Sequence, residues 1–317
     1  GSVDVMYFKK NKYFIIAFVL MLLIIFVAFK NFHQEYFGYV RTYNLIKENC
    51  YEGKDLDYFL CERYDTPEKL EEYLTTNDPT EIYESFDVRY VVSLLRFEFL
   101  FSLPLLFPLL IAILVIVTIH KEYSSGMFKN MLMRMNYKKY VRCYQTIAFK
   151  AALIPFISWI IIFLIALIYT DFNFGMQFHE FFSETYYNFL YNHTLLYAVG
   201  FLFVIFCVNY FYANIALFFV RRNKNMFVAI IQTFITAILF ALVMYLLFAF
   251  GLSIPFGLTE LAPYFNFISY CDGYYETLPI LIGVMIISFI ISLISTLIIK
   301  KIYSKKEKLI LDYETKV

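Results

Sequence analysis

Charged residues are scarce in this chain of 317 residues. Asp, Glu, Lys and Arg together make up 17% of it, whereas hydrophobic residues make up 61%. A soluble domain carries about 25% charged residues, because water must wet its surface. The deficit leaves too little polar surface to cover a globular fold of this size, so lipid must cover much of it. The net charge of +1 also argues against a nucleic-acid-binding protein, which carries a large basic excess.

Motifs for catalysis and for nucleotide or metal binding are absent. The sequence contains no GxxxxGK[ST] phosphate loop, no dinucleotide fingerprint, no HExxH and no GxSxG. Its four histidines are scattered, and its five cysteines show no CxxC spacing. We therefore predict no catalytic residue, no metal site and no cofactor bound by this chain itself, and we do not expect an enzyme.

Six stretches are long and apolar enough to cross about 30 Å of hydrocarbon as helices. They are residues 13–29, 99–119, 147–169, 195–220, 226–250 and 278–299. Ionisable residues are almost absent from their interiors, which argues against a proton-coupled carrier. The uncharged polar residues Asn209, Asn214 and Gln232 are of the kind that more often hold helices together than bind substrate. The fold class is therefore all-α and polytopic.

Lys and Arg residues indicate the orientation of these spans, because cytoplasmic loops carry an excess of them. Cations precede the first span, lie between the second and third and between the fourth and fifth, and follow the sixth. The other two short connections, 170–194 and 251–277, contain no Lys or Arg. We predict that both termini lie inside, with residues 1–5 as a cloning remnant, 6–31 as the cytoplasmic N-terminus and first span, 97–302 as the other five spans, and 303–317 as a cytoplasmic tail.

The long connection 32–96 differs from the others because it is acidic and lies on the predicted outer side. Thr66-Pro67 and Asp78-Pro79 each place a capping residue before a proline at a first helical position. We predict short helices over 68–74 and 80–86, and hence a small, mostly helical extracellular subdomain. Cys50 and Cys61 both lie in it; a disulfide between them and two unpaired thiols are equally consistent with the sequence.

The predicted cytoplasmic segment 121–135 contains an amphipathic pattern. On a helix, one stripe at i+4 spacing would hold four residues, with two more apolar residues beside it: Tyr123, Met127, Met131 and Met135, flanked by Phe128 and Leu132. Methionine-rich stripes make adaptable docking surfaces, and Gly126 suits a place where another backbone comes close. A helix lying flat on the lipid explains the same pattern, and periodicity alone does not separate the two.

The same segment resembles the E-x-x-x-G signature between the second and third spans of type-2 ABC transporter permeases. Here the signature is Glu122-Tyr123-Ser124-Ser125-Gly126, followed by Lys129-Asn130-Met131-Leu132. The resemblance covers most of residues 13–302 but is specific only at 122–134. The family often has a proline-containing turn shortly after the signature, where this chain has Arg134-Met135-Asn136-Tyr137. In the family, the loop corresponding to 251–277 forms short re-entrant helices in the outer leaflet.

The resemblance implies the membrane half of an ATP-driven exporter in a bacterial plasma membrane. A separate ABC ATPase, carrying ATP and Mg²⁺, would grip segment 121–135 as a coupling helix, and a second permease chain, identical or a sister, would complete the pathway. The residues expected to dock are Glu122, Tyr123, Gly126, Met127, Phe128, Met131 and Leu132. Glu122 would make a polar contact to the ATPase, and Gly126 would allow its backbone to approach closely.

The cargo is the least constrained part of this interpretation. Aromatic residues make up 21% of the chain, with 38 Phe and 29 Tyr, although Phe is an ordinary lipid-facing residue and Tyr an ordinary interfacial one. Members of the family in bacteria of similar composition commonly export amphipathic or antimicrobial peptides or confer resistance to them. We expect such a peptide or a similar hydrophobic compound, with ions or lipids as an alternative. A sensor that binds peptides on the acidic outer subdomain is a further possibility, and a membrane-embedded enzyme has the least support.

Overall fold

The computed structural model describes nine continuous stretches of the chain and six single residues. These are 12–51, 67–76, 88–95, 100, 103–134, 136–174, 192–248, 250–251, 255, 257, 267, 269–271, 273, 275 and 277–304. Over these residues the chain is helical and contains no β-strand. The prediction of an all-α fold is confirmed for this part of the chain. The predicted inside position of both termini stays a prediction.

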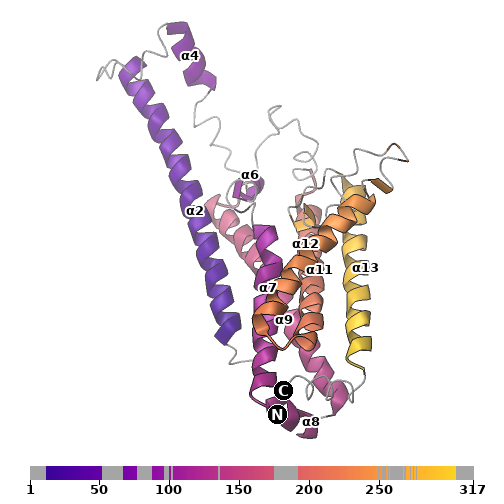
Figure 1. The fold of residues 1–317 in the computed structure, drawn as a ribbon. Coiled ribbons are helices and arrows are strands. Elements are labelled where there is room, and N and C mark those ends of the chain that lie inside the picture. Colours follow the sequence, from indigo (N-terminus) through magenta and orange to yellow (C-terminus); the bar gives the residue numbers. More distant parts are fainter. Residues whose placement is uncertain are drawn as a thin grey trace. The chain divides into compact units, whose positions relative to one another are not determined.

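Six helices are each long and apolar enough to cross a membrane. They are α2 (Lys12–Ile46), α7 (Leu103–Ser124), α9 (Tyr137–Tyr169), α11 (Thr194–Arg222), α12 (Met226–Phe248) and α13 (Leu278–Ile302) (Figure 1). Each contains most of one predicted span. Two of them are longer than predicted: α2 continues past residue 29 to Ile46, and α9 begins at Tyr137 rather than at 147. The shorter elements are η1 (Lys47–Tyr51), α4 (Pro67–Thr76), α6 (Val88–Leu94), α8 (Met127–Arg134) and η7 (Ser269–Cys271).

The chain divides into two compact units, which are described separately. The first comprises Gly1–Leu22, Phe101–Ile161 and His179–Val317, and so contains α7, α8, α11, α12, α13 and most of α9. The second comprises Leu23–Leu100 and Ile162–Phe178, with most of α2, α4, α6 and the end of α9.

Helix α11 forms the centre of the first unit. It packs against α7, α12 and α13, and more than half of its residues are buried. Trp159 of α9 is fully buried and meets Phe201 of α11 edge to face, with ring centroids 4.9 Å apart. Neighbouring helices and large aromatic side chains thus bury most of α11.

Helices α11 and α13 run in the same direction and pack with a constant register. In each of three contacts the residue on α13 comes 81 positions later: Gly200 with Leu281, Asn214 with Ser295, and Arg221 with Ile302. The residues on each helix are therefore spaced by multiples of seven. A seven-residue repeat keeps one face of a helix turned toward its partner, and small or polar residues on that face allow two membrane helices to approach closely.

Part of the predicted outer loop 251–277 packs against α11. Phe267, Tyr270, Cys271 and Tyr275 are buried, and the Tyr197 hydroxyl of α11 donates to the Gly273 carbonyl at 2.7 Å. Apolar backbone that is not part of a long helix thus lies within protein here, as required at membrane depth. η7 is a short 3₁₀ helix; the rest of the predicted re-entrant helices lies outside the described residues.

The second unit joins α2 to the end of α9 through aromatic side chains. Tyr169 meets Phe32 and His33 edge to face, and its hydroxyl lies 3.0 Å from His33 Nδ1. Farther along α2, the Tyr43 hydroxyl donates to the Leu74 carbonyl of α4 at 3.1 Å. The first residues of the predicted subdomain 32–96 are therefore not a separate fold but a continuation of α2.

The predicted helix 68–74 is confirmed as α4, whereas the predicted helix 80–86 lies outside the described residues. Cys50 is disulfide-bonded. Cys61, which the sequence offers as one possible partner, lies outside the described residues, as does almost all of the predicted tail 303–317.

We predict that Gly200→Ala destabilises the α11–α13 contact. A Cβ at this position would lie 2.8 Å from Leu281 Cδ1 and 3.1 Å from its Cγ, and Leu281 is itself fully buried. Overpacking of this kind costs about 1–3 kcal/mol, so thermal unfolding of the purified protein should begin at a lower temperature. Gly283→Ala on α13 is the control, because its added Cβ meets no atom within 4 Å. Equal unfolding temperatures for the two variants would contradict the packing.

Candidate functional site

A sharp turn joins α7 to α8. The Gly126 backbone has φ +68°, a left-handed conformation that a Cβ disfavours. Its amide donates to the Tyr123 carbonyl at 3.3 Å, and its own carbonyl accepts from the Lys129 amide at 3.1 Å. A glycine in this conformation just after a helix is a common way for the chain to leave it. Segment 121–135 is therefore not one continuous helix, and the prediction of a single stripe from Tyr123 to Met135 is wrong in that respect.

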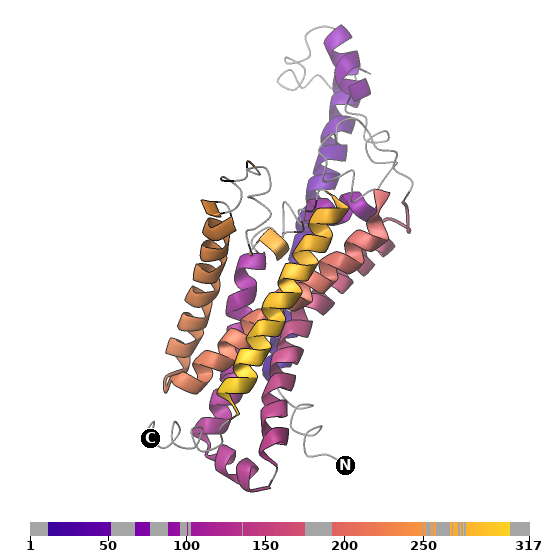
Figure 2. The same cartoon turned by 90° about the vertical axis from the view of Figure 1, so that its right-hand side faces the viewer.

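Helix α8 turns one face toward the bundle and the other away from it. Leu132 is buried, and Met127 and Met131 are partly buried. The opposite face is exposed over four residues: Lys129, Asn130, Met133 and Arg134. Both views place α8 at one end of the bundle, below α7 and α9 (Figures 1 and 2).

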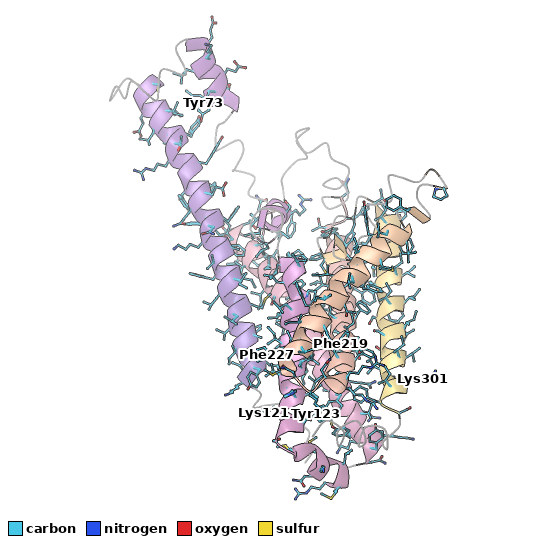
Figure 3. The ribbon with its side chains drawn as sticks, viewed as in Figure 1. Tyr73, Lys121, Tyr123, Phe219, Phe227 and Lys301 are labelled. Atoms are coloured by element: carbon cyan, nitrogen blue, oxygen red, sulfur yellow. The ribbon has the colours of Figure 1, made fainter. Side chains whose placement is uncertain are left out.

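Glu122, at the base of α7, is buried, with 3% of its surface exposed. Among the residues that the structure describes, its side chain accepts one long hydrogen bond, from the Tyr144 hydroxyl to Oε2 at 3.5 Å. A buried carboxylate is costly unless it is well paired. In Figure 3, the labelled neighbours Lys121 and Tyr123 mark this end of α7, directly above α8.

Tyrosines from α7 and α9 surround Glu122. The hydroxyls of Tyr140 and Tyr144, one turn apart on α9, are hydrogen-bonded to each other, and their rings meet edge to face at 4.7 Å. The ring of Tyr123 lies 6.5 Å from that of Tyr144. Tyr140 and Tyr144 are almost fully buried. The root of α8 is thus fixed to α9 by packed rings and hydroxyls.

Arg221 and Tyr303 extend this cluster to α11 and α13. The Arg221 guanidinium donates to the Ile302 carbonyl and lies 5.1 Å from the Tyr303 ring centroid. A cation at the carboxyl end of a helix is favourable, because the last carbonyls are unpaired and the helix dipole is negative there. These contacts hold the Arg221 side chain inside the protein, where only 6% of its surface is exposed.

Tyr303, directly after α13, is bonded to both α11 and α9. Its hydroxyl donates to the Leu217 carbonyl of α11 at 2.8 Å, and its carbonyl accepts from the Tyr137 hydroxyl of α9. Its ring lies 5.7 Å from that of Tyr144. Burial raises the pKa of the Tyr303 phenol well above its ordinary value. The phenol therefore keeps its proton and remains a hydrogen-bond donor. We call Glu122, Tyr123, Tyr137, Tyr140, Tyr144, Arg221 and Tyr303 the basal cluster.

A second set of polar contacts ties the α11–α12 connection to α7. His120, two residues before Glu122, donates through Nε2 to the Lys224 carbonyl at 2.8 Å. Asn223 Nδ2 donates to the Phe219 carbonyl and to Gln232 Oε1, at 3.0 and 2.8 Å. Together with the basal cluster, these bonds connect the base of α7 to all four other long helices of the first unit.

The sequence-predicted site residues fall into two groups. Glu122, Tyr123 and Leu132 are turned toward the bundle, whereas Met127 and Met131 lie at the border of the exposed face of α8. Gly126 forms the turn; a Cβ there would meet no atom within 4 Å in this chain. The backbone of Phe128 lies in α8, but its side chain and the whole of Met135 lie outside the described residues.

Sequence reasoning missed five members of the basal cluster: Tyr137, Tyr140, Tyr144, Arg221 and Tyr303. Among these, Tyr140 and Tyr144 stand out by their spacing. The i+4 interval between these two was the available signal, since such residues share one face of a helix. Among the described residues, no group of three or more His, Cys, Asp or Glu side chains could hold a metal ion. The hydrogen bonds and ring contacts of the basal cluster connect α7, α9, α11 and the end of α13.

Fold and site together define a multi-pass membrane protein in which a short end helix is hinged to a packed polar cluster. Comparison with known protein families, with curated proteins and with solved structures finds no significant match.

We predict that Gly126→Ala disturbs the turn more than Gly126→Asn does. Asparagine tolerates the left-handed conformation, whereas for alanine it costs about 1–2 kcal/mol. Hydrogen exchange of the backbone amides over 121–134 should be faster in the alanine variant and close to wild type in the asparagine variant. If the larger side chain disturbs the segment and alanine does not, space around Gly126 matters and its left-handed backbone does not.

Proposed function

We propose that this chain is the permease subunit of an ATP-driven exporter and that α8 is its coupling helix. One observation carries the proposal: α8 is hinged by Gly126 to α7, and the last turn of α7 is anchored in the basal cluster. A push on α8 therefore acts on a junction of several membrane helices. The resemblance of Glu122–Gly126 to the E-x-x-x-G signature supports the same assignment. ATP and Mg²⁺ would be bound by a separate ATPase, since this chain has no phosphate loop.

In this proposal the ATPase contacts the exposed face of α8, which is formed by Lys129, Asn130, Met133 and Arg134. Met133 is 77% exposed, a high value for a methionine next to a membrane-spanning bundle. An exposed methionine between two cations suits a groove with an apolar floor and an acidic rim. Met127 and Met131 would complete the contact.

We propose a role for Glu122 and Tyr123 that differs from the docking role expected from the sequence. Because both are turned toward the bundle, we assign them to transmission rather than to direct contact with the ATPase. Closure of two nucleotide-bound ATPases would displace α8 and turn it about Gly126. The displacement would reach α9 through Tyr140 and Tyr144, and α11 and α13 through Arg221 and Tyr303.

The wider assembly follows from the same proposal. A second permease chain, identical or a sister, would complete the pathway across a bacterial plasma membrane, with both termini and α8 in the cytoplasm. An amphipathic or antimicrobial-type peptide, or a similar hydrophobic compound, is the proposed cargo, with ions or lipids as the alternative. Support for the peptide comes from family habit and composition. The large buried rings of Trp159 and Phe267 add none, because they pack against Phe201 and Phe211 within the protein.

Charge reversal on α8 tests the proposed docking. The chain is purified from its native membrane in mild detergent, and Mg²⁺-dependent ATP hydrolysis that co-elutes with it is measured. Lys129→Glu combined with Arg134→Glu should remove most of this activity, at least tenfold, while the protein still inserts in the membrane. Lys300→Glu with Lys301→Glu is the control, because both lysines are exposed at the end of α13, off α8. Equal ATPase activity in the two double variants would refute docking through α8.

A second candidate function is a peptide sensor without transport. α4 presents the exposed carboxylates Glu68, Glu71 and Glu72 and is attached to the long helix α2 by Tyr43. Such a face attracts cationic peptides. Inside-out vesicles separate the two functions: a pump accumulates a fluorescent cationic amphipathic peptide when ATP is supplied. Binding to the α4 side of the protein without ATP-dependent accumulation would favour the sensor.

A further inference from the structure

Asn214 is a buried polar residue in the middle of the apolar helix α11. Its side chain is 1% exposed. Nδ2 donates two hydrogen bonds to α13, one to Ser295 Oγ at 2.9 Å and one to Thr296 Oγ1 at 3.1 Å. The amide therefore joins the two helices within the seven-residue contact pattern.

The orientation of this amide is fixed by the hydroxyls that it faces. Ser295 and Thr296 each donate their single hydroxyl proton to the Ser292 carbonyl, both at 2.8 Å. Each hydroxyl can then only accept from Asn214, so the amide nitrogen must point toward α13. With the oxygen in its place, Asn214 would present an acceptor to two acceptors.

Asn214 Oδ1 is consequently left over. It is fully buried and has no hydrogen-bond partner among the described residues. A buried carbonyl oxygen without a donor is costly, and in folded proteins such atoms are nearly always satisfied by protein or by ordered water. Ser292 lies on the same buried face of α13 and is 6% exposed. Its hydroxyl likewise has no hydrogen-bond partner in the part of the chain that the structure describes.

We propose that Asn214 Oδ1 and the Ser292 hydroxyl hold a single water molecule between α11 and α13, inside the membrane-spanning part of the protein. Water supplies the donor that Oδ1 lacks and the acceptor that the serine proton lacks. A metal cation fits less well, because neither helix contains an Asp or Glu to neutralise it. This site is independent of the proposed transport function.

The position of this water matters for the packing of α13 against α11. α13 packs mainly against α11 among the described elements. The polar middle of this contact, between Gly200 at one end and Arg221 at the other, is therefore the part of the attachment of α13 that depends on hydration.

Water-edited solid-state NMR in lipid bilayers tests the site directly. In protein labelled with ¹⁵N-asparagine and ¹⁵N-glycine, the Asn214 side-chain amide should receive polarisation from water about as fast as that of Asn223, which is partly exposed. The buried backbone amide of Gly200 provides the dry reference. If Asn214 builds up as slowly as Gly200, the site is dry and the proposal is overturned.

Two serine variants separate hydration from packing. Ser292→Ala removes one partner of the water but leaves both hydrogen bonds of Asn214 to α13, so water transfer to Asn214 should fall at least twofold. Ser288→Ala is the matched control, because the Ser288 hydroxyl is already bonded to the Met285 carbonyl of its own helix; transfer should not change. An equal effect of both variants would overturn the assignment of Ser292. Should either variant fail to fold, a high-resolution map of the wild-type protein decides: density about 2.7–3.2 Å from Oδ1 supports the water, and its absence refutes it.

Discussion

The parallel contact between α11 and α13 is the constraint on which the rest of the first unit depends. Helices surrounded by lipid gain little from burying apolar surface against each other, so close packing and hydrogen bonds must hold them together. Here both are present along one face, with Gly200 against Leu281 and Asn214 against Ser295. α11 is also the helix that α7 and α12 pack against. A slip of α13 along α11 would therefore break the contacts at Arg221 and Tyr303 as well.

The basal cluster combines burial of aromatic rings with hydrogen bonds between helices. Tyr140, Tyr144 and Tyr303 are buried like residues of a hydrophobic core, and Tyr137, Tyr144 and Tyr303 each donate a hydroxyl to another helix. Tyr303 shows this best, because its phenol, its carbonyl and its ring each contact a different group. Glu122 is buried, and within the described part of the chain its side chain accepts one long hydrogen bond, from Tyr144; a carboxylate bonded in this way gains stability from any movement that brings water or a donor to it. The cluster therefore holds one weakly bonded carboxylate, that of Glu122, among tyrosines that connect the helices.

Hydropathy and charge predict the six long helices well, because crossing lipid demands an apolar run of sufficient length. Hydropathy and charge do not predict helix ends that extend past the apolar run. α9 begins at Tyr137 because Tyr140 and Tyr144 are buried, but Lys138, Lys139 and Arg142 on its other face lower the mean hydropathy of the same turns. α2 continues to Ile46 for a similar reason: Glu35 and Arg41 end the apolar run without ending the helix.

The site was predictable in outline but not in its connections. The amphipathic pattern and the E-x-x-x-G signature pointed to the segment around α8, yet they could not reveal that Gly126 turns the chain there, because a glycine is compatible with both a helix and a turn. Contacts such as Arg221 with Ile302 join residues far apart in the sequence, and no local pattern encodes them. The seven-residue spacing of Gly200, Cys207, Asn214 and Arg221 was visible in the sequence, although its meaning depends on the partner helix.

The length of α2 exceeds what one membrane crossing requires. Thirty-five residues at 1.5 Å each give a rod of about 52 Å, whereas the hydrocarbon layer is about 30 Å thick. The helix is therefore about 20 Å longer than the hydrocarbon layer is thick, and η1 and α4 lie at its carboxyl end. A protease added from the side where this excess length lies can therefore cut α2 or α4 without entering the hydrocarbon layer.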